Sequence, residues 1–511
     1  MSSDLNRRTF LGNAAGAAAA FTIVPRNVLG GAGFVAPSDK LNVAHIGLGT
    51  EGIREMMPMM LSEELQIVAV CDPNKDSTDY IDWSRNGLAN DIRKFLGKPD
   101  WRKDLDGIPG GREVGRDVVE TYYGSKRPSG QFKGCASFAD FRELFEKQKD
   151  LDAVKIMTPD HLHATISIAA MKKGKHVLMH KPIANRVDEA RKVLEVRRQS
   201  KVATYFMPWD ARGPIDTVMA WVNDGAIGKL REVHNWSHRP VWPQYLTLPT
   251  ERPPIPNGFD WDLWLGPERD RPFSPNYTHA VFRGWYDFGG GSICDMGHYS
   301  LWTVLNALDL VGPTSVDPML SHTCGFRDTV AFTVNNDFSF PTASAVRFKY
   351  PARGPRPAVD LIWYDGGMRP PTPEELDEDK RDLQAEQMMF VGDKGKILAG
   401  FNVQNPRLIP ERRMSGYPPP PEPQPRQPRG AYQPSPGIRQ WMAACRGAQQ
   451  QSAGSFQNAW PISEAVNLYA AALRSRRKLL YDPEKMEITS YAAANQYLAR
   501  EYRKGFEPDA V

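Results

Sequence analysis

The chain has 511 residues, of which 41% are hydrophobic, 10% aromatic and 24% charged, and these globular proportions exclude a wholly disordered chain. Its length allows roughly two to four domains. The 64 Lys plus Arg and 60 Asp plus Glu give a net charge of +4, and because no basic run stands out we expect no nucleic-acid partner. The five cysteines are too scattered for a disulfide scaffold or a CxxC zinc site, and we expect no metal centre.

The N-terminus has the order of an export signal. Arg7 and Arg8 precede Phe10 and an apolar run rich in Ala and Gly over residues 12–24. The pattern resembles a twin-arginine signal, which export machinery recognises and which does not anchor the chain. The run of about 13 residues is too short to span a bilayer, and we expect no membrane span elsewhere. We predict that residues 1–36 are signal and linker and that the protein is periplasmic or otherwise exported; the alternative is a frayed basic terminus.

Residues 37–207 alternate short apolar strands with helices, which is typical of an α/β Rossmann domain with a parallel, doubly wound sheet. The predicted strands cover 40–46, 66–71, 153–157, 176–179 and 202–206, and the predicted helices cover 53–61, 112–123, 138–148, 163–173 and 185–199.

Residues 208–511 have a different sequence pattern, with long predicted strands and few predicted helices. This pattern indicates an α+β domain with a large, mainly antiparallel open-faced sheet. Residues 415–436 are Pro-rich and are expected to form an extended surface loop. The predicted strands cover 230–238, 329–340, 343–350, 359–363 and 387–390, and the predicted helices cover 215–224, 438–446 and 463–474.

The first predicted strand runs directly into the sequence Gly-Leu-Gly-Thr-Glu-Gly at 47–52, and Asp72 ends the second strand about twenty positions later. Glycines let the backbone approach a pyrophosphate, the following helix N-terminus attracts its charge, and the Asp accepts from ribose hydroxyls. No Arg adjoins Asp72 in sequence, which favours NAD, and NADP stays open. The alternative is a tight strand–helix turn with a surface Asp. The predicted contacts are Gly47, Gly49, Thr50, Glu51, Gly52 and Asp72.

Two further motifs follow predicted strands, at the sheet edge where an open α/β fold binds ligands. The first is Thr-Pro-Asp-His-Leu-His at 158–163, and the second is His-Lys-Pro at 180–182. The Lys181 ammonium can polarise a substrate oxygen, although a lysine is by default a surface residue. From these motifs we expect cofactor contacts by Thr158, Pro159, His161, His163, Lys181 and Pro182.

The fourth motif is Gly-Gly-Gly-Ser-Ile-Cys-Asp-Met-Gly-His at 289–298. On a helix, Asp295 and His298 are three residues apart and face one way, so a carboxylate could tune an imidazole as a general base. The alternative is a Gly-rich turn with a capping Asp.

The four motifs together resemble those of the Gfo/Idh/MocA oxidoreductases, from about residue 40 to the C-terminus. The resemblance includes the segment 262–267 and the Arg-Gly-Trp sequence at 283–285. It implies a Rossmann domain followed by an open-faced sheet through which subunits associate into a homo-oligomer. The family's Glu-Lys-Pro motif matches Lys181 and Pro182 but has His180 in place of Glu. The family's Asp and His map onto Asp295 and His298, at a spacing of three where many members have four.

The resemblance implies hydride transfer between a sugar-like secondary alcohol and a nicotinamide. His298 would act as acid/base, Asp295 as its partner or a hydroxyl ligand, and Lys181 would stabilise negative charge on the substrate oxygen. Aromatic and Arg side chains suit a sugar, although several of them will be core. The candidates are Trp209, Arg212, Trp236, Arg283, Trp285 and Tyr286, of which Arg212, Arg283 and Trp285 are the predicted substrate contacts.

Export adds a constraint on the cofactor. Outside the cytoplasm no pool of free NAD re-oxidises a released cofactor, so we expect NAD to be bound during folding and kept. Either transfer between two sugars or transient oxidation of a glycoside, elimination and re-reduction, as in the NAD-dependent glycosidases, satisfies this. A non-catalytic protein that binds sugar or nucleotide is an alternative of another class.

Overall fold

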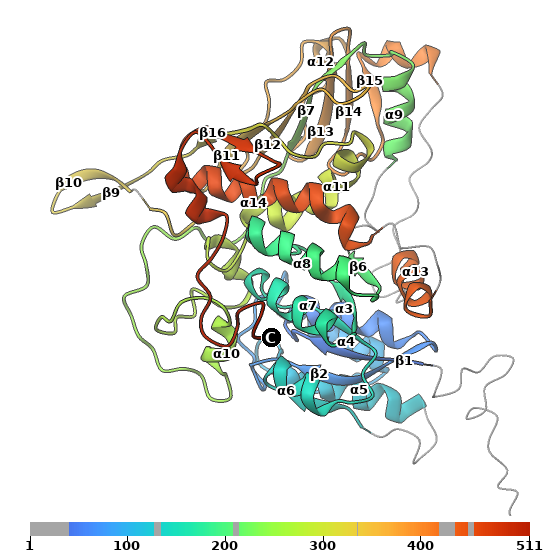
Figure 1. Cartoon of the computed structure of the whole chain (residues 1–511), viewed down its shortest axis with the longest axis vertical. Coiled ribbons are helices and arrows are strands. Elements are labelled where there is room, and N and C mark those ends of the chain that lie inside the picture. Colours follow the sequence, from blue (N-terminus) through green and yellow to red (C-terminus); the bar gives the residue numbers. More distant parts are fainter. Residues whose placement is uncertain (1–39, 127–133, 208–213, 335, 418–434, 448–453) are drawn as a thin grey trace, which may run out of the picture.

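The structure is a computed structural model and describes residues 40–126, 134–207, 214–334, 336–417, 435–447 and 454–511. The predicted export signal, Trp209, Arg212 and most of the Pro-rich segment lie outside these residues. A parallel sheet and a larger second sheet lie at opposite ends of the molecule, with helices between them (Figure 1). Within the described parts, no helix is long and apolar enough to cross a bilayer.

The first domain is built on six parallel strands in the order β3-β2-β1-β4-β5-β6, as predicted for a doubly wound fold. The strand order reverses direction between β1 and β4, and open α/β sheets generally bind ligands at the carboxyl ends of the strands beside such a reversal. The strands are β1 (Leu41–Ile46), β2 (Leu65–Cys71), β3 (Ala136–Phe138), β4 (Ala153–Ile156), β5 (His176–Met179) and β6 (Thr204–Phe206).

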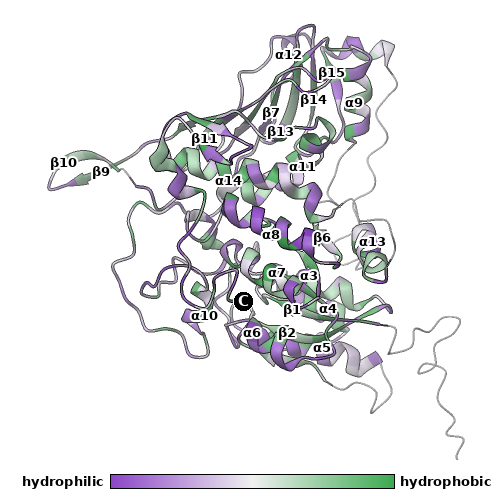
Figure 2. Ribbon diagram, viewed as in Figure 1, coloured by the Kyte–Doolittle hydropathy of each residue, from purple (hydrophilic) through white to green (hydrophobic). Residues whose placement is uncertain are grey.

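Helices flank this sheet on both faces and alternate hydrophilic with hydrophobic residues (Figure 2). Short β3 and helix α4 were not predicted, because the polar, Gly-rich stretch that contains them lacks a clear apolar period. The helices are α3 (Thr50–Met60), α4 (Gly87–Leu96), α5 (Arg112–Lys126), α6 (Phe141–Lys147), η2 (Asp160–Leu162), α7 (His163–Lys172) and α8 (Val187–Gln199).

The second domain holds a nine-stranded sheet in the order β15-β14-β13-β7-β12-β11-β8-β16-β17. Only β12 and β7 pair in parallel, so the sheet is mixed and mostly antiparallel, which confirms the predicted fold class. Its strands are β7 (Leu230–Trp236), β8 (Ser315–Leu320), β11 (Ser344–Tyr350), β12 (Val359–Tyr364), β13 (Gln387–Gly392), β14 (Lys396–Gly400), β15 (Arg407–Ile409), β16 (Leu479–Asp482) and β17 (Glu487–Ile488).

A separate hairpin of β9 (Thr323–Arg327) and β10 (Val330–Val334) projects from the body (Figure 1). The predicted strand over 329–340 is therefore wrong beyond Val334, because residues 336–340 turn back into the domain without strand structure. The remaining helices are α9 (Ile215–Asn223), α10 (Trp261–Leu265), η4 (His279–Gly284), η5 (Ile293–Gly297), α11 (His298–Ala307), α12 (Glu375–Glu378), η6 (Glu411–Gly416), α13 (Pro436–Cys445), η7 (Phe456–Ala459), α14 (Trp460–Ser475) and η8 (Ala492–Tyr497).

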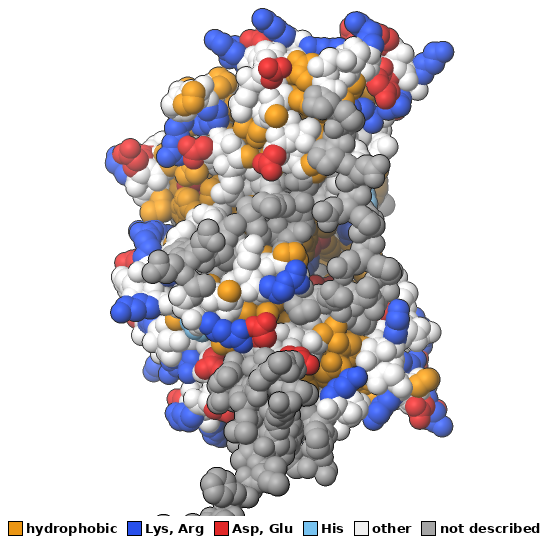
Figure 3. Space-filling model, turned by 90° about the vertical axis from the view of Figure 1, so that its right-hand side faces the viewer, with side chains coloured by type: hydrophobic (Ala, Val, Ile, Leu, Met, Phe, Trp, Pro, Cys, Tyr) orange, Lys and Arg blue, Asp and Glu red, His pale blue; other side chains and the backbone are white. Residues whose placement is uncertain are grey.

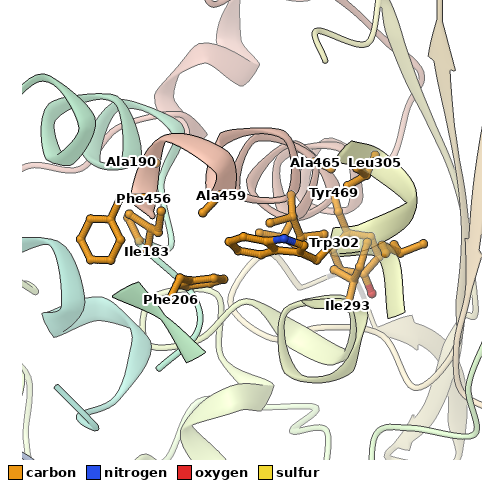
Figure 4. Close-up of a cluster of buried hydrophobic side chains, with 14 of the residues drawn as sticks. Ile183, Ala190, Phe206, Ile293, Trp302, Leu305, Phe456, Ala459, Ala465 and Tyr469 are labelled. Carbon is orange, nitrogen blue, oxygen red and sulfur yellow. The ribbon is translucent and has the colours of Figure 1, made fainter. Parts of the chain in front are cut away.

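One continuous apolar core joins the two domains. Phe206 at the end of β6 stacks on Trp302 of α11, with ring centroids 4.8 Å apart, and both rings are buried. Helix α14 from the C-terminal part of the chain closes this core over α8 and α11 (Figure 4). Its labelled members are Ile183, Ala190, Phe206, Ile293, Trp302, Leu305, Phe456, Ala459, Ala465 and Tyr469.

The surface agrees with the near-neutral net charge of the sequence. Positive and negative side chains are interspersed on the face turned to the viewer in Figure 3.

Candidate functional site

Three of the four predicted motifs meet at the carboxyl edge of the parallel sheet. Gly47 follows β1, Asp72 follows β2, Thr158 lies just after β4, and Lys181 lies just after β5. Gly47 has a φ of +97°, and a Cβ there would lie 2.7 Å from the Thr158 backbone nitrogen, so only glycine lets these two strand ends approach so closely.

The glycine turn and the start of α3 form a cradle suited to a phosphate. A Cβ on Gly52 would lie 2.1 Å from the Gly47 carbonyl oxygen, so this turn closes only with glycine. No side chain caps α3 at Gly49, which leaves its first N–H groups for an anion. The hydroxyl of Thr158 is buried and has no hydrogen-bond partner within the described residues. These features fit the phosphates and the nicotinamide half of a dinucleotide, with Thr50 in the first turn.

Asp72 is buried and already holds the glycine turn. Its Oδ2 accepts from the Leu48 N–H at 2.6 Å and its Oδ1 from the Asn74 N–H at 2.8 Å, and burial raises its pKa. Each oxygen keeps a second lone pair for a ribose hydroxyl. The structure also brings Arg112 next to Asp72, because its Nη1 donates to the Asp72 carbonyl at 3.0 Å. The sequence hides this neighbour, on which the preference for NAD over NADP partly depends.

Residues 73–87 form a segment that we call the strap, and it covers the cradle. The Tyr80 ring lies against the glycine turn, 3.3 Å from a Cβ built on Gly49. From the second domain, His279 packs on this ring with centroids 4.1 Å apart, and its Nε2 lies 3.4 Å from Asp79 Oδ1. This His279 contact is the largest cause of the lowered pKa of Asp79.

The same strap is bound to the second domain at two further places. The Lys75 N–H donates to the Gly258 carbonyl at 2.9 Å, and the guanidinium of Arg239 lies over the Trp83 ring, 5.0 Å from its centroid. The strap and the second domain therefore cover the glycine turn together.

The two histidines of the 158–163 motif are braces within the protein. His161 Nε2 lies 2.9 Å from the Trp264 carbonyl oxygen, and burial lowers the pKa of His161 to about 3. His163 lies between the carbonyl oxygens of Pro182, at 2.5 Å, and Thr158, at 2.8 Å. His163 thus joins the ends of β4 and β5 with both of its ring nitrogens, whereas one nitrogen of His161 has no partner within the described residues. Pro159 precedes the short η2 helix.

Lys181 and Asp295 form the charged centre of the site. Lys181 Nζ donates to Asp295 Oδ1 at 2.8 Å, and the Arg283 Nε lies 3.3 Å from the same oxygen. The Lys181 side chain is 2% exposed and that of Asp295 is 15% exposed. Burial opposes ionisation of Asp295, but the two cations win and hold its pKa below its usual value. A carboxylate held by two cations at a crevice can orient a hydroxyl beside an ammonium.

Asp160 is a second carboxylate that the prediction did not use. Its Oδ1 lies 3.4 Å from Arg283 Nη1, and its Oδ2 accepts from the Gly290 N–H at 3.1 Å. Asp160 therefore fixes the Gly-rich loop of the second domain against the end of β4.

Helical spacing predicted that His298 and Asp295 share one face, but His298 does not lie on the accessible side where Asp295 lies. Residues 293–297 form a π-helix, η5. Its wider turn places Tyr299, four positions after Asp295, on the same side as Asp295, and turns His298, three positions after it, away. The His298 ring is fully buried, and its Nδ1 lies 2.7 Å from the Cys294 carbonyl. Burial first, and the charge of Lys181 second, lower the pKa of His298 to about 3.

The predicted aromatic substrate contacts are buried in the core. The Trp285 indole is 1% exposed and donates to the Asn276 carbonyl at 2.7 Å, so the side chain predicted to contact substrate is packed inside the protein. Trp236 donates to the Gln384 carbonyl, and Tyr286 is buried as well. Of the predicted substrate residues, Arg283 alone lies at the charged centre among those the structure describes.

Sequence reasoning missed one contact beside Lys181. The Tyr299 hydroxyl lies 2.8 Å from His180 Nε2, and the Tyr299 ring centroid is 5.7 Å from Lys181 Nζ. The signal was present, because Tyr299 lies four residues after Asp295, the spacing common in the resembling family. Across the described ranges, no three His, Cys, Asp or Glu side chains are grouped as metal ligands.

Comparison with known proteins identifies two successive family segments. Residues 118–207 match the Gfo/Idh/MocA oxidoreductase family model with an NAD-binding Rossmann fold, and residues 217–317 match the C-terminal alpha/beta domain of the same family. The first match begins after the glycine turn at 47–52, so support for the phosphate cradle comes from the structure and not from this match.

Curated relatives share part of the chain. A levoglucosan dehydrogenase from Pseudarthrobacter phenanthrenivorans is 29% identical over 114 residues, which cover 21% of this chain and 29% of that protein. Glycosyl hydrolase family 109 protein 1 from Akkermansia muciniphila is 25% identical over 200 residues, covering 39% of this chain and 34% of that protein. The chain thus spans about a third of the length of these relatives.

A solved structure shares the fold over most of the chain. The WlbA dehydrogenase from Bordetella pertussis, in complex with NADH and UDP-GlcNAcA, superposes with a TM-score of 0.50 at 13% identity, covering 87% of this chain and 99% of that chain. Residues 118–207 and 217–317 thus match two successive domains of the Gfo/Idh/MocA oxidoreductases, an NAD-binding Rossmann fold and the C-terminal domain, and the solved structure shares the fold over most of the chain.

Proposed function

We propose that this chain is an exported oxidoreductase that transfers hydride between a secondary alcohol of a sugar and a nicotinamide dinucleotide that it keeps bound. The observation that carries the proposal is the Lys181–Asp295 ion pair, which lies at the carboxyl edge of the sheet next to the phosphate cradle. The sugar dehydrogenases among the relatives support this class of substrate.

The residues of the charged centre have distinct tasks in this reaction. A bound nicotinamide supplies the hydride acceptor. Lys181 directs its ammonium at the substrate oxygen and stabilises the negative charge that develops there. Asp295 accepts from a neighbouring hydroxyl and fixes the orientation of Lys181, while Arg283 holds Asp295 in place.

Retention of the cofactor is part of the proposal. The twin-arginine pattern at Arg7 and Arg8 supports export of the folded protein. An exported dehydrogenase can turn over only if its NAD stays bound, because no pool of free NAD replaces it outside the cytoplasm. The enclosed strap supports slow release, since Tyr80 and His279 must separate before the adenosine side opens. We propose NAD as the cofactor, with NADP as the alternative that Arg112 makes worth testing.

A glycosidase reaction is the second candidate. The match of 200 residues to a family 109 glycosyl hydrolase is the observation that favours it. Transient oxidation of a glycoside acidifies the neighbouring C–H bond, after which elimination and re-reduction return the cofactor to its starting state.

One experiment separates these functions. The exported form is purified, denatured and assayed for released nucleotide by absorbance and mass spectrometry. Intact protein is then incubated with sugars and glycosides while reduction of bound nucleotide and release of aglycone are followed. Reduction without aglycone supports the oxidoreductase, aglycone without net reduction supports the glycosidase, and bound nucleotide with neither supports a non-catalytic binding protein. Protein without nucleotide contradicts retention.

Retention is tested on the strap itself. Tyr80→Ala removes the ring between the glycine turn and His279, and we expect release of NAD to accelerate about ten- to hundredfold. Tyr491→Ala, at an exposed tyrosine of the second domain, should leave the release rate unchanged. Equal release rates in both variants would contradict the role of the strap.

We also propose that subunits associate through the nine-stranded sheet. Arg347, Glu232 and Asp360 form a partly exposed charged network on its strands. Light scattering of the purified protein tests this proposal, and a monomer at micromolar concentration would contradict it.

A further inference from the structure

The accessible side of residues 289–299 consists of Asp295, Met296 and Tyr299, while the remaining residues of this segment are buried. Tyr299 directs its hydroxyl to His180 Nε2 at 2.8 Å, and His180 immediately precedes Lys181. A phenol and an imidazole, already joined by a hydrogen bond, therefore lie beside the lysine that would face the substrate oxygen.

We infer that Tyr299 and His180 form the proton-transfer pair of the site, an inference that rests on the proposed function. In the oxidation, the substrate O–H bond breaks as its proton binds the Tyr299 oxygen, while the Tyr299 proton moves to His180 Nε2. The electron pair of the adjacent C–H bond leaves as hydride to the oxidised nicotinamide named in that proposal. His180 is half-buried and releases a proton to solvent from its other ring nitrogen. Reduction runs the same transfers in reverse.

Electrostatics favour a proton that passes through this pair and does not stay. Burial, and then the charge of Lys181, lower the pKa of His180 well below its usual range, so the imidazole is neutral and its Nε2 can accept. Burial and the neighbouring Asp295 raise the pKa of Tyr299, so the phenol keeps its proton and donates it to His180. The Tyr299 oxygen then has lone pairs free for a substrate hydroxyl.

His298 lacks these properties. Its Nδ1 faces the Cys294 carbonyl and therefore donates, which leaves Nε2 as the only basic atom. Nε2 is buried with no partner within the described residues, and the ring packs against Phe206 with centroids 5.5 Å apart. A substrate hydroxyl on the accessible side of Asp295 meets Tyr299 first.

The test compares two variants that each remove one tyrosine–histidine hydrogen bond. Tyr299→Phe removes the proposed donor, whereas Tyr364→Phe removes a matched bond to His234 Nδ1, 3.0 Å long, in the nine-stranded sheet. We expect Tyr299→Phe to slow reduction of bound nucleotide by sugar at least about a hundredfold, the usual size of general acid–base catalysis. Its nucleotide content and sugar affinity should stay within about fivefold, the effect of one hydrogen bond. Tyr364→Phe should match the wild type.

A second readout needs no turnover. In substrate-free protein carrying its nucleotide, Tyr299→Phe should shift the imidazole nitrogen resonance that His180→Gln removes, and Tyr364→Phe should leave it in place. An unshifted resonance, or reduction by Tyr299→Phe within threefold of the wild type, overturns the pair. A hundredfold loss in folded, nucleotide-bearing His298→Gln with no loss in Tyr299→Phe also overturns it. If no sugar or glycoside reduces the nucleotide bound to the wild-type protein, the result contradicts the proposed function, and the Tyr299–His180 proton-transfer pair with it.

Discussion

Two buried lysines of the parallel sheet each face a carboxylate, yet their surroundings differ. Lys155 lies within β4, is fully buried, and donates to the Glu55 carbonyl at 2.9 Å and carboxylate at 3.1 Å, both on α3 of the same domain. Lys181 lies beyond the end of β5 and pairs with Asp295 of the other domain, which keeps part of its surface exposed. A charge sealed inside one domain serves packing, whereas a charge at the strand end, shared between domains, is available to a ligand.

The largest expected effect separates the two lysines by activity. Lys181→Met should reduce hydride transfer by about a thousandfold or more, because it removes the ammonium that stabilises negative charge on the substrate oxygen. Arg283 does not replace it, since its guanidinium is already paired with Asp160 and Asp295. Lys155→Met should keep turnover within about threefold, since the Glu55 carboxylate that loses its partner is 35% exposed and can be solvated, and Lys155 lies inside the first domain. The measurement is reduction of bound nucleotide by sugar. Equal losses in the two variants would erase the distinction.

The carboxylate partners sharpen the same contrast. Asp295→Asn removes the negative charge shared by Lys181 and Arg283 and turns one carboxylate oxygen into a donor NH2 group, and we expect turnover to fall about ten- to hundredfold through lost orientation. Glu55→Gln should keep turnover but reduce the free energy of unfolding by about 1–3 kcal/mol, because the Lys155 ammonium stays buried with a weaker partner. Activity assays and urea unfolding of both variants check this, and a large activity loss in Glu55→Gln would contradict it.

Acid should destabilise both regions through buried neutral histidines. Burial, followed by Lys155, lowers the pKa of His45 well below 6.5, and the pKa of His298 beside Lys181 is about 3. The unfolded chain therefore binds these protons first, so the stability is complete above pH 6.5 and is lost as pH falls toward the folded pKa values. His45→Leu should reduce the slope by an amount that grows to about 1.4 kcal/mol per pH unit as the pH falls from 6.5 to 5. Urea unfolding at each pH measures the slope, and an unchanged slope contradicts the assignment.

The smallest effect concerns two buried hydroxyls. Thr158 follows β4 and Thr165 lies in α7, and neither hydroxyl has a partner within the described residues. Thr158→Val should weaken NAD binding about three- to tenfold, the size of one hydrogen bond to the cofactor. Thr165→Val should leave NAD affinity unchanged. A titration of nucleotide-free protein measures both, and an equal effect would place the cofactor elsewhere.

The sequence was sufficient for the parallel sheet and for half of the charged centre. Apolar runs ending in glycine or a charged residue predicted β1, β2, β4 and β5, because fully buried strands carry this pattern. Lys181 and Asp295 could be predicted as neighbours only through the family resemblance, since 114 positions separate them.

What the sequence could not provide depended on tertiary contacts. The π-helix at 293–297 could not be predicted from a local pattern, although the spacing of four common in the resembling family already indicated Tyr299 beside Asp295. Arg112 reaches Asp72 across 40 positions, and His279 reaches the strap from the other domain. Trp285 was assigned to substrate from its chemistry, whereas burial decides its role.

The contacts between the two domains determine where this protein can be divided into fragments. Phe206 rests on Trp302, and its backbone N–H donates to the Gly454 carbonyl at 2.8 Å, so the last strand of the nucleotide-binding half is completed by chain that arrives some 250 residues later. Stopping translation after residue 207 would strip α8 and β6 of their cover and leave an aggregation-prone fragment. We therefore expect the two halves to fold together, and a swap with a relative should exchange both halves.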